Sequence, residues 1–182
     1  MRVKLVQRTL SYGMDTLTRN RWFFTPVYGS ALVAVGAELT AAIGPTAVHL
    51  RGDEIGLEAV RLPELGFVGE PVPTPSMAIE QTLSAGRIPV VTPLAVGPLN
   101  VNADEAATAV AEGLGADRIV FVSDVPGVFV AGSVLSLLHA DYAIDLIKSG
   151  TVDGGIVPKL LAAVRAARLG LTVEIGATAV VA

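Results

Sequence analysis

The chain of 182 residues contains no cysteine, and only 16% of its residues are charged. The absence of cysteine excludes disulfide bonds, a thiolate nucleophile and cysteine-bound metal ions. Acidic residues outnumber basic ones by 17 to 13, and no basic stripe with interleaved aromatic residues is present, so we expect no nucleic-acid partner. The two histidines, His49 and His139, lack the spacing of metal ligands. We predict no metal site and expect both histidines to be structural or to lie at the surface.

Long apolar runs are also missing. Arg2, Lys4 and Arg8 interrupt the first apolar residues, so this stretch is not expected to be a signal peptide. No stretch reaches the roughly 18 apolar residues of a membrane span, and we expect no membrane partner and a cytoplasmic protein. The hydrophobic content of 52% nevertheless indicates an extensive buried sheet. The length suits one domain over residues 1–182, with residues 1–36 atypical.

Apolar runs and helical patterns alternate along the chain. Such alternation predicts an α/β fold, with a mostly parallel sheet and helices on both of its faces. Two strands around residues 51–54 are expected to form a hairpin-like unit. The predicted strands are 1–8, 46–50, 57–62, 88–96, 118–122 and 171–175, and the predicted helices are 30–43, 76–85, 103–114, 139–149 and 155–169.

Three short segments lie where an apolar run meets a helical pattern: residues 99–107, 121–129 and 153–164. In an open α/β sheet this junction presents the ligand site. The segments carry single polar side chains, and the second and third also contain glycine, which indicates anion or phosphate chemistry rather than nucleophilic or metal catalysis. The polar residues concerned are Asn100, Asn102, Asp104, Ser123, Asp124 and Lys159.

Each of these residues also has a plainer interpretation, which the sequence leaves open. Lys159 suits the first turn of a solvated amphipathic helix, where lysine is common. Asp104 suits the start of a helix, where an acidic side chain contributes a few tenths to about 1 kcal/mol. Asn100 and Asn102 suit turns, and residues 124–127 suit a type I or type II turn.

As a set, the segments NVNAD, SDVPGV and GGIVPK resemble the amino acid kinase family, with the greatest similarity to its N-acetylglutamate kinases. The resemblance extends through ELGFVGEP and SAGRIPVVTPLAV and covers residues 37–182. It implies a three-layer αβα sandwich of the carbamate kinase type. It also implies a homodimer that phosphorylates the side-chain carboxylate of N-acetyl-L-glutamate with ATP, a step of arginine biosynthesis, with Mg²⁺ carried by the nucleotide.

The resemblance also assigns roles to residues of this chain. It implies that Lys159 stabilises the transferring phosphoryl group and that Asp104 orients the catalytic lysines. The position of Asn100, together with Asn102, would hold the acylated amino acid. The residues implied for the nucleotide are Ser123, Asp124, Val125, Gly127, Gly154 and Gly155.

The sequence departs from the family pattern near its start. The resembled kinases carry a Lys-x-Gly-Gly segment and a His-Gly-Gly-Gly loop around the β- and γ-phosphates, whereas the only Gly-Gly pair here is Gly154-Gly155. The arginine that clasps the acceptor has only a poorly fitting candidate in Arg21. Two alternatives therefore stay open, a degenerate nucleotide-binding homologue and a kinase for another acidic acceptor such as carrier-bound aminoadipate.

The alanine-rich stretch 30–43 could pack against a partner or inside the molecule, and inhibition by arginine is not expected.

Overall fold

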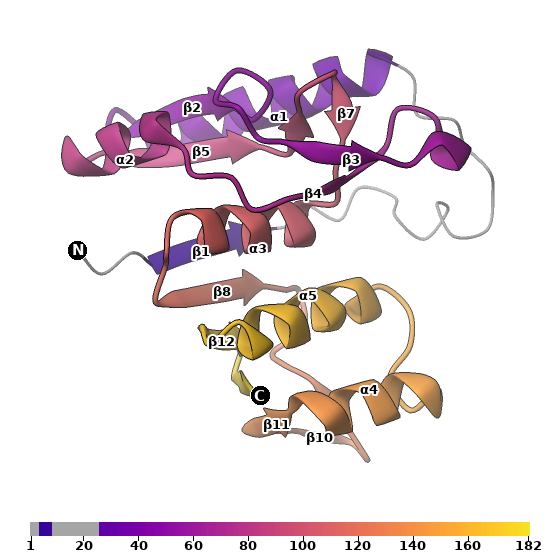
Figure 1. The fold of residues 1–182 in the computed structure, drawn as a ribbon. Helices are drawn as coiled ribbons and strands as arrows, with labels where there is room; N and C mark the ends of the chain where they lie inside the picture. Colours follow the sequence, from indigo (N-terminus) through magenta and orange to yellow (C-terminus); the bar gives the residue numbers. More distant parts are fainter. Residues whose placement is uncertain (1–3, 9–25) are drawn as a thin grey trace. The chain divides into compact units, whose positions relative to one another are not determined.

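The computed structural model describes residues 4–8 and 26–182, which divide into two compact units (Figure 1). The first unit joins residues 4–8 to residues 103–182, and the second contains residues 26–102. Each unit has its own strands and helices and is described by itself. The single-domain organisation stays a prediction.

The first unit is built on a five-stranded sheet in the order β1-β8-β12-β13-β11. β12 and β13 pair antiparallel, and the other neighbours pair parallel. A short antiparallel pair, β9 with β10, follows β8. The bounds are β1 Lys4–Arg8, β8 Arg118–Val122, β9 Phe129–Val130, β10 Ser133–Val134, β11 Leu137–His139, β12 Thr172–Ile175 and β13 Thr178–Val181.

Three helices accompany this sheet: α3 (Ala103–Gly113), α4 (Ala140–Lys148) and α5 (Ile156–Arg168). α5 contacts both other helices as well as β8, β12 and β13, while α3 contacts β1 and β8. Helices that contact one another and neighbouring strands lie on the same face of a sheet. Leu160, Ala163 and Ala167 of α5 are buried, at the i, i+3, i+7 spacing that turns one helical face to the core.

The second unit is centred on a parallel pair of strands, β2 (Ala47–Arg51) and β5 (Ile88–Thr92). Two helices, α1 (Pro26–Ile43) and α2 (Met77–Ser84), contact both strands. Two short antiparallel pairs complete the unit, β3 with β4 and β6 with β7. Their bounds, with those of a 3₁₀ turn η2, are β3 Ala59–Arg61, η2 Pro63–Leu65, β4 Gly69–Pro71, β6 Leu94–Ala95 and β7 Leu99–Asn100.

The predicted α/β alternation is confirmed, and the five-stranded sheet is mostly parallel, as predicted. The strand over 118–122 has the predicted bounds, and the helix predicted over 103–114 ends one residue earlier. α1 begins before the predicted residue 30 but ends at Ile43 as predicted. Gly44 then takes a φ of 101°, the left-handed conformation that ends helices at little cost for glycine. α1 contacts β2 and β5 of its own unit, but most of residues 29–43 are exposed or half-buried, so packing of this helix against a partner stays a prediction.

The predicted hairpin around residues 51–54 is wrong. β2 pairs parallel with β5, and β3 pairs antiparallel with β4 instead. The loop closes on itself, since the N–H of Leu57 donates to the carbonyl of Gly52 at 2.8 Å. The alternation of apolar residues identifies a strand but does not show which strand it pairs with. The predicted pairing of the strands over 46–50 and 57–62 is therefore wrong.

Two further boundaries differ from expectation. The strand expected over 88–96 is divided into β5 and β6 at Pro93, which has no N–H for a ladder hydrogen bond. The closing strand is present as β12, but it is followed by β13, which was not predicted. Gly176, with a φ of 55°, starts the short connection between β12 and β13.

Candidate functional site

The central feature of the first unit is a buried ion pair between Lys159 and Asp104. Lys159 lies in the first turn of α5, and Asp104 lies in the first turn of α3. The Nζ of Lys159 is 2.7 Å from Oδ1 of Asp104, and each residue is only 5% exposed. The interpretation of Lys159 as a solvated lysine is therefore wrong, and Asp104 is more than an exposed acid at a helix start. Buried charges of this kind are stable only when they are paired.

The ammonium of Lys159 also lies over an aromatic ring. Its Nζ is 5.7 Å from the ring centroid of Phe121, within the range of a cation–π contact. Phe121 is fully buried in β8, so its ring is a fixed surface. Carboxylate and ring together restrict where this positive charge can lie.

The predicted nucleotide residues lie in two loops of the same unit. Ser123 and Asp124 directly follow β8, and the Ser123 hydroxyl donates to Oδ1 of Asp124 at 3.3 Å. Val125 and Gly127 lie further along this loop and line a cavity of about 210 Å³. The other residues lining it are Val128, Phe129, Thr151, Val152, Asp153 and Ile156.

Gly154 and Gly155 directly precede α5. Gly154 has a φ of 67°, and a Cβ placed at either glycine would meet no atom within 4 Å. Their residue neighbours, Asp153 and Ile156, both line the cavity. Because neither glycine has a side chain, nothing from this pair covers the N-terminus of α5. The backbone N–H groups at a helix N-terminus can attract an anion.

The predicted acceptor residues lie in the second unit. Asn100 belongs to β7, and its backbone N–H donates to the carbonyl of Phe67 at 2.8 Å. Asn102 lies between β7 and α3, and both asparagine residues are half-buried. Arg21, the candidate for clasping the acceptor, lies outside the described residues. The structure therefore joins Lys159 to Asp104 and gathers the nucleotide loops in the first unit, while the asparagines belong to the second.

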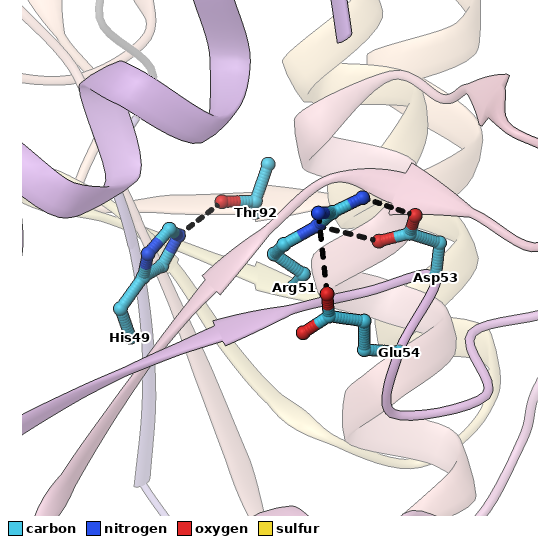
Figure 2. A network of polar contacts seen from close by, with 5 residues as sticks. All are labelled: His49, Arg51, Asp53, Glu54 and Thr92. Atoms are coloured by element: carbon cyan, nitrogen blue, oxygen red, sulfur yellow. Dashed lines mark hydrogen bonds and ion pairs between the residues drawn. The ribbon is translucent and has the colours of Figure 1, made fainter. Parts of the chain in front are cut away.

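The second unit contains a charged cluster that sequence reasoning missed (Figure 2). Arg51 contacts Asp53 at 2.7 and 3.2 Å and Glu54 at 3.2 Å. The hydrogen bonds to Asp53, helped by its charge, raise the pKa of Arg51 above its ordinary value. Arg51 lines a cavity of about 360 Å³ together with Ser30. Two carboxylates outweigh the single guanidinium, so this cluster is unsuited to an anionic ligand.

His49 belongs to a separate contact in the same unit. Its Nε2 is 2.7 Å from the hydroxyl of Thr92, a fully buried residue of β5 (Figure 2). His139 precedes α4 and is exposed. These positions agree with the structural and surface roles expected of the two histidines.

Two features are absent from the described ranges, 4–8 and 26–182. No group of three or more His, Cys, Asp or Glu side chains there could hold a metal ion. No helix in those ranges is both long and apolar enough to cross a bilayer.

Comparison with known proteins connects these features to one family. The chain is 42% identical to the acetylglutamate kinase of Roseiflexus castenholzii over an alignment of 149 residues, and the match covers 76% of this chain and 58% of the relative. A similar match to the acetylglutamate kinase of a second Roseiflexus strain also covers 58% of that relative, and one to the enzyme of Pelotomaculum thermopropionicum covers 48%. The chain thus spans about half to three fifths of the length of the curated relatives it matches.

Solved structures share the fold. The structure of smu.665 from Streptococcus mutans is 28% identical with a TM-score of 0.70, and the match covers 80% of this chain and 64% of that chain. Carbamate kinase from Giardia lamblia bound to AMP-PNP is 13% identical with a TM-score of 0.57, covering 86% and 69% of the two chains. The expected carbamate kinase-like α/β fold is confirmed. The family model described as the amino acid kinase family matches residues 23–177, and the chain belongs to that family.

Proposed function

We propose that the chain binds ATP and transfers its γ-phosphoryl group to the side-chain carboxylate of N-acetyl-L-glutamate. The observation that carries this proposal is the buried ion pair between Lys159 and Asp104 at 2.7 Å. The curated relatives named acetylglutamate kinase support the choice of acceptor. The family supports a phosphotransferase.

The proposed reaction needs charge compensation more than proton transfer. The acceptor carboxylate is already anionic, so no general base is required. One of its oxygens forms a bond to the γ-phosphorus while the bond to the bridging oxygen of ADP breaks, giving an acyl phosphate and ADP. The ammonium of Lys159 would offset the repulsion between the two anions, and Asp104 would hold that ammonium in place before the substrates arrive.

The nucleotide loops offer a fitting place for ATP. The cavity of about 210 Å³ is lined mainly by apolar side chains, which suit the flat face of a base better than they suit phosphate. The uncovered start of α5 at Gly154 and Gly155 suits a phosphate group. In this proposal Mg²⁺ enters as a ligand of the ATP phosphates, where it neutralises part of their charge.

A substitution that keeps the positive charge tests the catalytic role. Lys159→Arg retains a cation beside Asp104 but replaces the compact ammonium by a planar guanidinium. We expect acyl phosphate formation to fall by about 100- to 1000-fold, as for the loss of one preorganised group. The measurement is trapping of the product as a hydroxamate, with ATP, Mg²⁺ and N-acetylglutamate. Thermal unfolding of the same samples controls for folding, and a folded variant with wild-type turnover would contradict the role of Lys159.

A second candidate is a nucleotide-binding homologue without turnover. The observation that favours it is that the sequence lacks a Lys-x-Gly-Gly segment and a His-Gly-Gly-Gly loop. ATP binding by calorimetry without product in the hydroxamate assay would support this candidate. A panel of acidic acceptors, including a carrier-bound aminoadipate, separates it from a kinase with a different substrate.

A further inference from the structure

Thr178 links β13 to the loop that follows β8. Its side chain is fully buried. The hydroxyl oxygen accepts a hydrogen bond from the N–H of Val128 at 2.9 Å and donates one to the carbonyl of Leu135 at 2.7 Å. One hydroxyl therefore satisfies two backbone groups that are far from it in the sequence.

The backbone around Thr178 strengthens this link. The N–H of Ala177 donates to the carbonyl of Pro126 at 2.7 Å, and the N–H of Ala179 donates to the carbonyl of Ser136 at 3.0 Å. Within the loop, the N–H of Leu135 donates to the carbonyl of Val128 at 2.9 Å. The hydrogen bonds of Thr178 thus lie between two backbone contacts that hold residues 126–136 against β13.

The approach is close enough to require glycine. A Cβ at Gly127 would lie 2.7 Å from both the hydroxyl oxygen of Thr178 and Cγ1 of Val134. Gly176 has a φ of 55°, and a Cβ there would collide with the carbonyl of Pro126. A side chain at either glycine would push the loop away from β13.

This contact fixes one wall of the cavity described above. Gly127, Val128 and Phe129 line the cavity of about 210 Å³, and Val128 is the residue whose N–H the hydroxyl holds. Thr178 itself is not among the lining residues. We propose that Thr178 is a positioning residue that sets the Gly127–Phe129 wall for the nucleotide, an inference that rests on the proposed function.

Two substitutions at Thr178 separate the hydroxyl from the shape of the side chain. Thr178→Val keeps the shape and removes both hydrogen bonds, whereas Thr178→Ser keeps the hydroxyl. One measurement is hydrogen exchange of the Val128 amide, compared with the Ala179 amide, whose bond to Ser136 both variants retain. The other is the Kd for ATP by calorimetry. We expect Thr178→Val to raise the exchange of Val128 relative to Ala179 about tenfold, the factor given by the loss of a typical hydrogen bond. We expect its Kd for ATP to rise by a similar factor and Thr178→Ser to resemble the wild type in both.

The possible results test the role of Thr178 separately from the proposed function on which it rests. Equal acceleration of both amides in Thr178→Val would mean general destabilisation and would overturn the specific link. Faster exchange of Val128 with an unchanged Kd would overturn the positioning role. If the wild-type chain binds no ATP, the proposed function is overturned, and so is the role of Thr178 in ATP binding. Hydrogen exchange of Val128 would then still test the hydrogen bond between Thr178 and Val128. If Thr178→Val does not fold, Gly127→Ala displaces the same hydroxyl, and the same ratio of exchange rates supports or overturns the link.

Discussion

Lys159→Met is expected to lower the free energy of unfolding by about 3 kcal/mol, because breaking a buried ion pair by removing one of its members is strongly destabilising. Methionine keeps a flexible apolar stem of similar length, so the change removes the charge more than the packing. Both Lys159 and Asp104 are only 5% exposed, which leaves water little access to the remaining carboxylate. Urea denaturation followed by circular dichroism measures the change.

The same helix supplies a matched control for this substitution. Arg168 of α5 forms an ion pair with Asp141 at the same distance of 2.7 Å, but its side chain is 52% exposed. Arg168→Met is expected to change the stability by less than about 0.5 kcal/mol, since exposed pairs contribute little. If the two variants lose equal stability, the buried pair has no special energetic role.

A double variant tests whether the loss arises from the pair. Asp104→Asn combined with Lys159→Met removes both charges at once. We expect the double variant to be more stable than the sum of the two single changes predicts, by at least about 1 kcal/mol of coupling. Additive losses would show that Lys159 and Asp104 act independently.

Three elements of the first unit were predictable because their periodicity is strong. The apolar run over 118–122 is β8, and the alanine-rich patterns at 103–114 and 155–169 are α3 and α5. The Lys159–Asp104 pair could be predicted only as a set of motifs, because 55 residues separate the two side chains. Taken alone, each residue suited an ordinary exposed helix start.

Strand pairing and close contacts could not be predicted from the same patterns. Alternation in residues 46–62 indicated two strands, but the partner of β2 is β5, which lies beyond a helix. Thr178 stands in a stretch that gave no polar motif, and its role depends on Val128 and Leu135, which are distant in the sequence. Long-range backbone partners leave no local signature in composition or spacing.

Gly36→Ala is expected to destabilise the second unit by about 2 kcal/mol, although alanine normally favours a helix over glycine by about 1 kcal/mol. Gly36 lies in α1, and a Cβ there would be 2.5 Å from both Nε2 of His49 and the hydroxyl oxygen of Thr92. These two atoms are already joined at 2.7 Å, and Thr92 is buried, so neither side chain can move without breaking a partly buried hydrogen bond. Thermal and urea unfolding of the variant measure the loss.

Gly29→Ala is the matched control, because it places the same methyl group on the same helix without a clash. A Cβ at Gly29 would lie 3.6 Å from Cδ1 of Leu94, an ordinary van der Waals distance. This variant is expected to be as stable as the wild type or more stable by up to about 1 kcal/mol, the helix propensity of alanine over glycine. The two alanine variants should therefore differ from each other in stability by about 2 to 3 kcal/mol. Equal stabilities would mean that α1 does not approach His49 and Thr92 as closely as the structure has it. Helix propensity contributes to the stability of both variants with the same sign. The difference between their free energies of unfolding therefore measures the clash of the added methyl group with the hydrogen-bonded pair of His49 and Thr92.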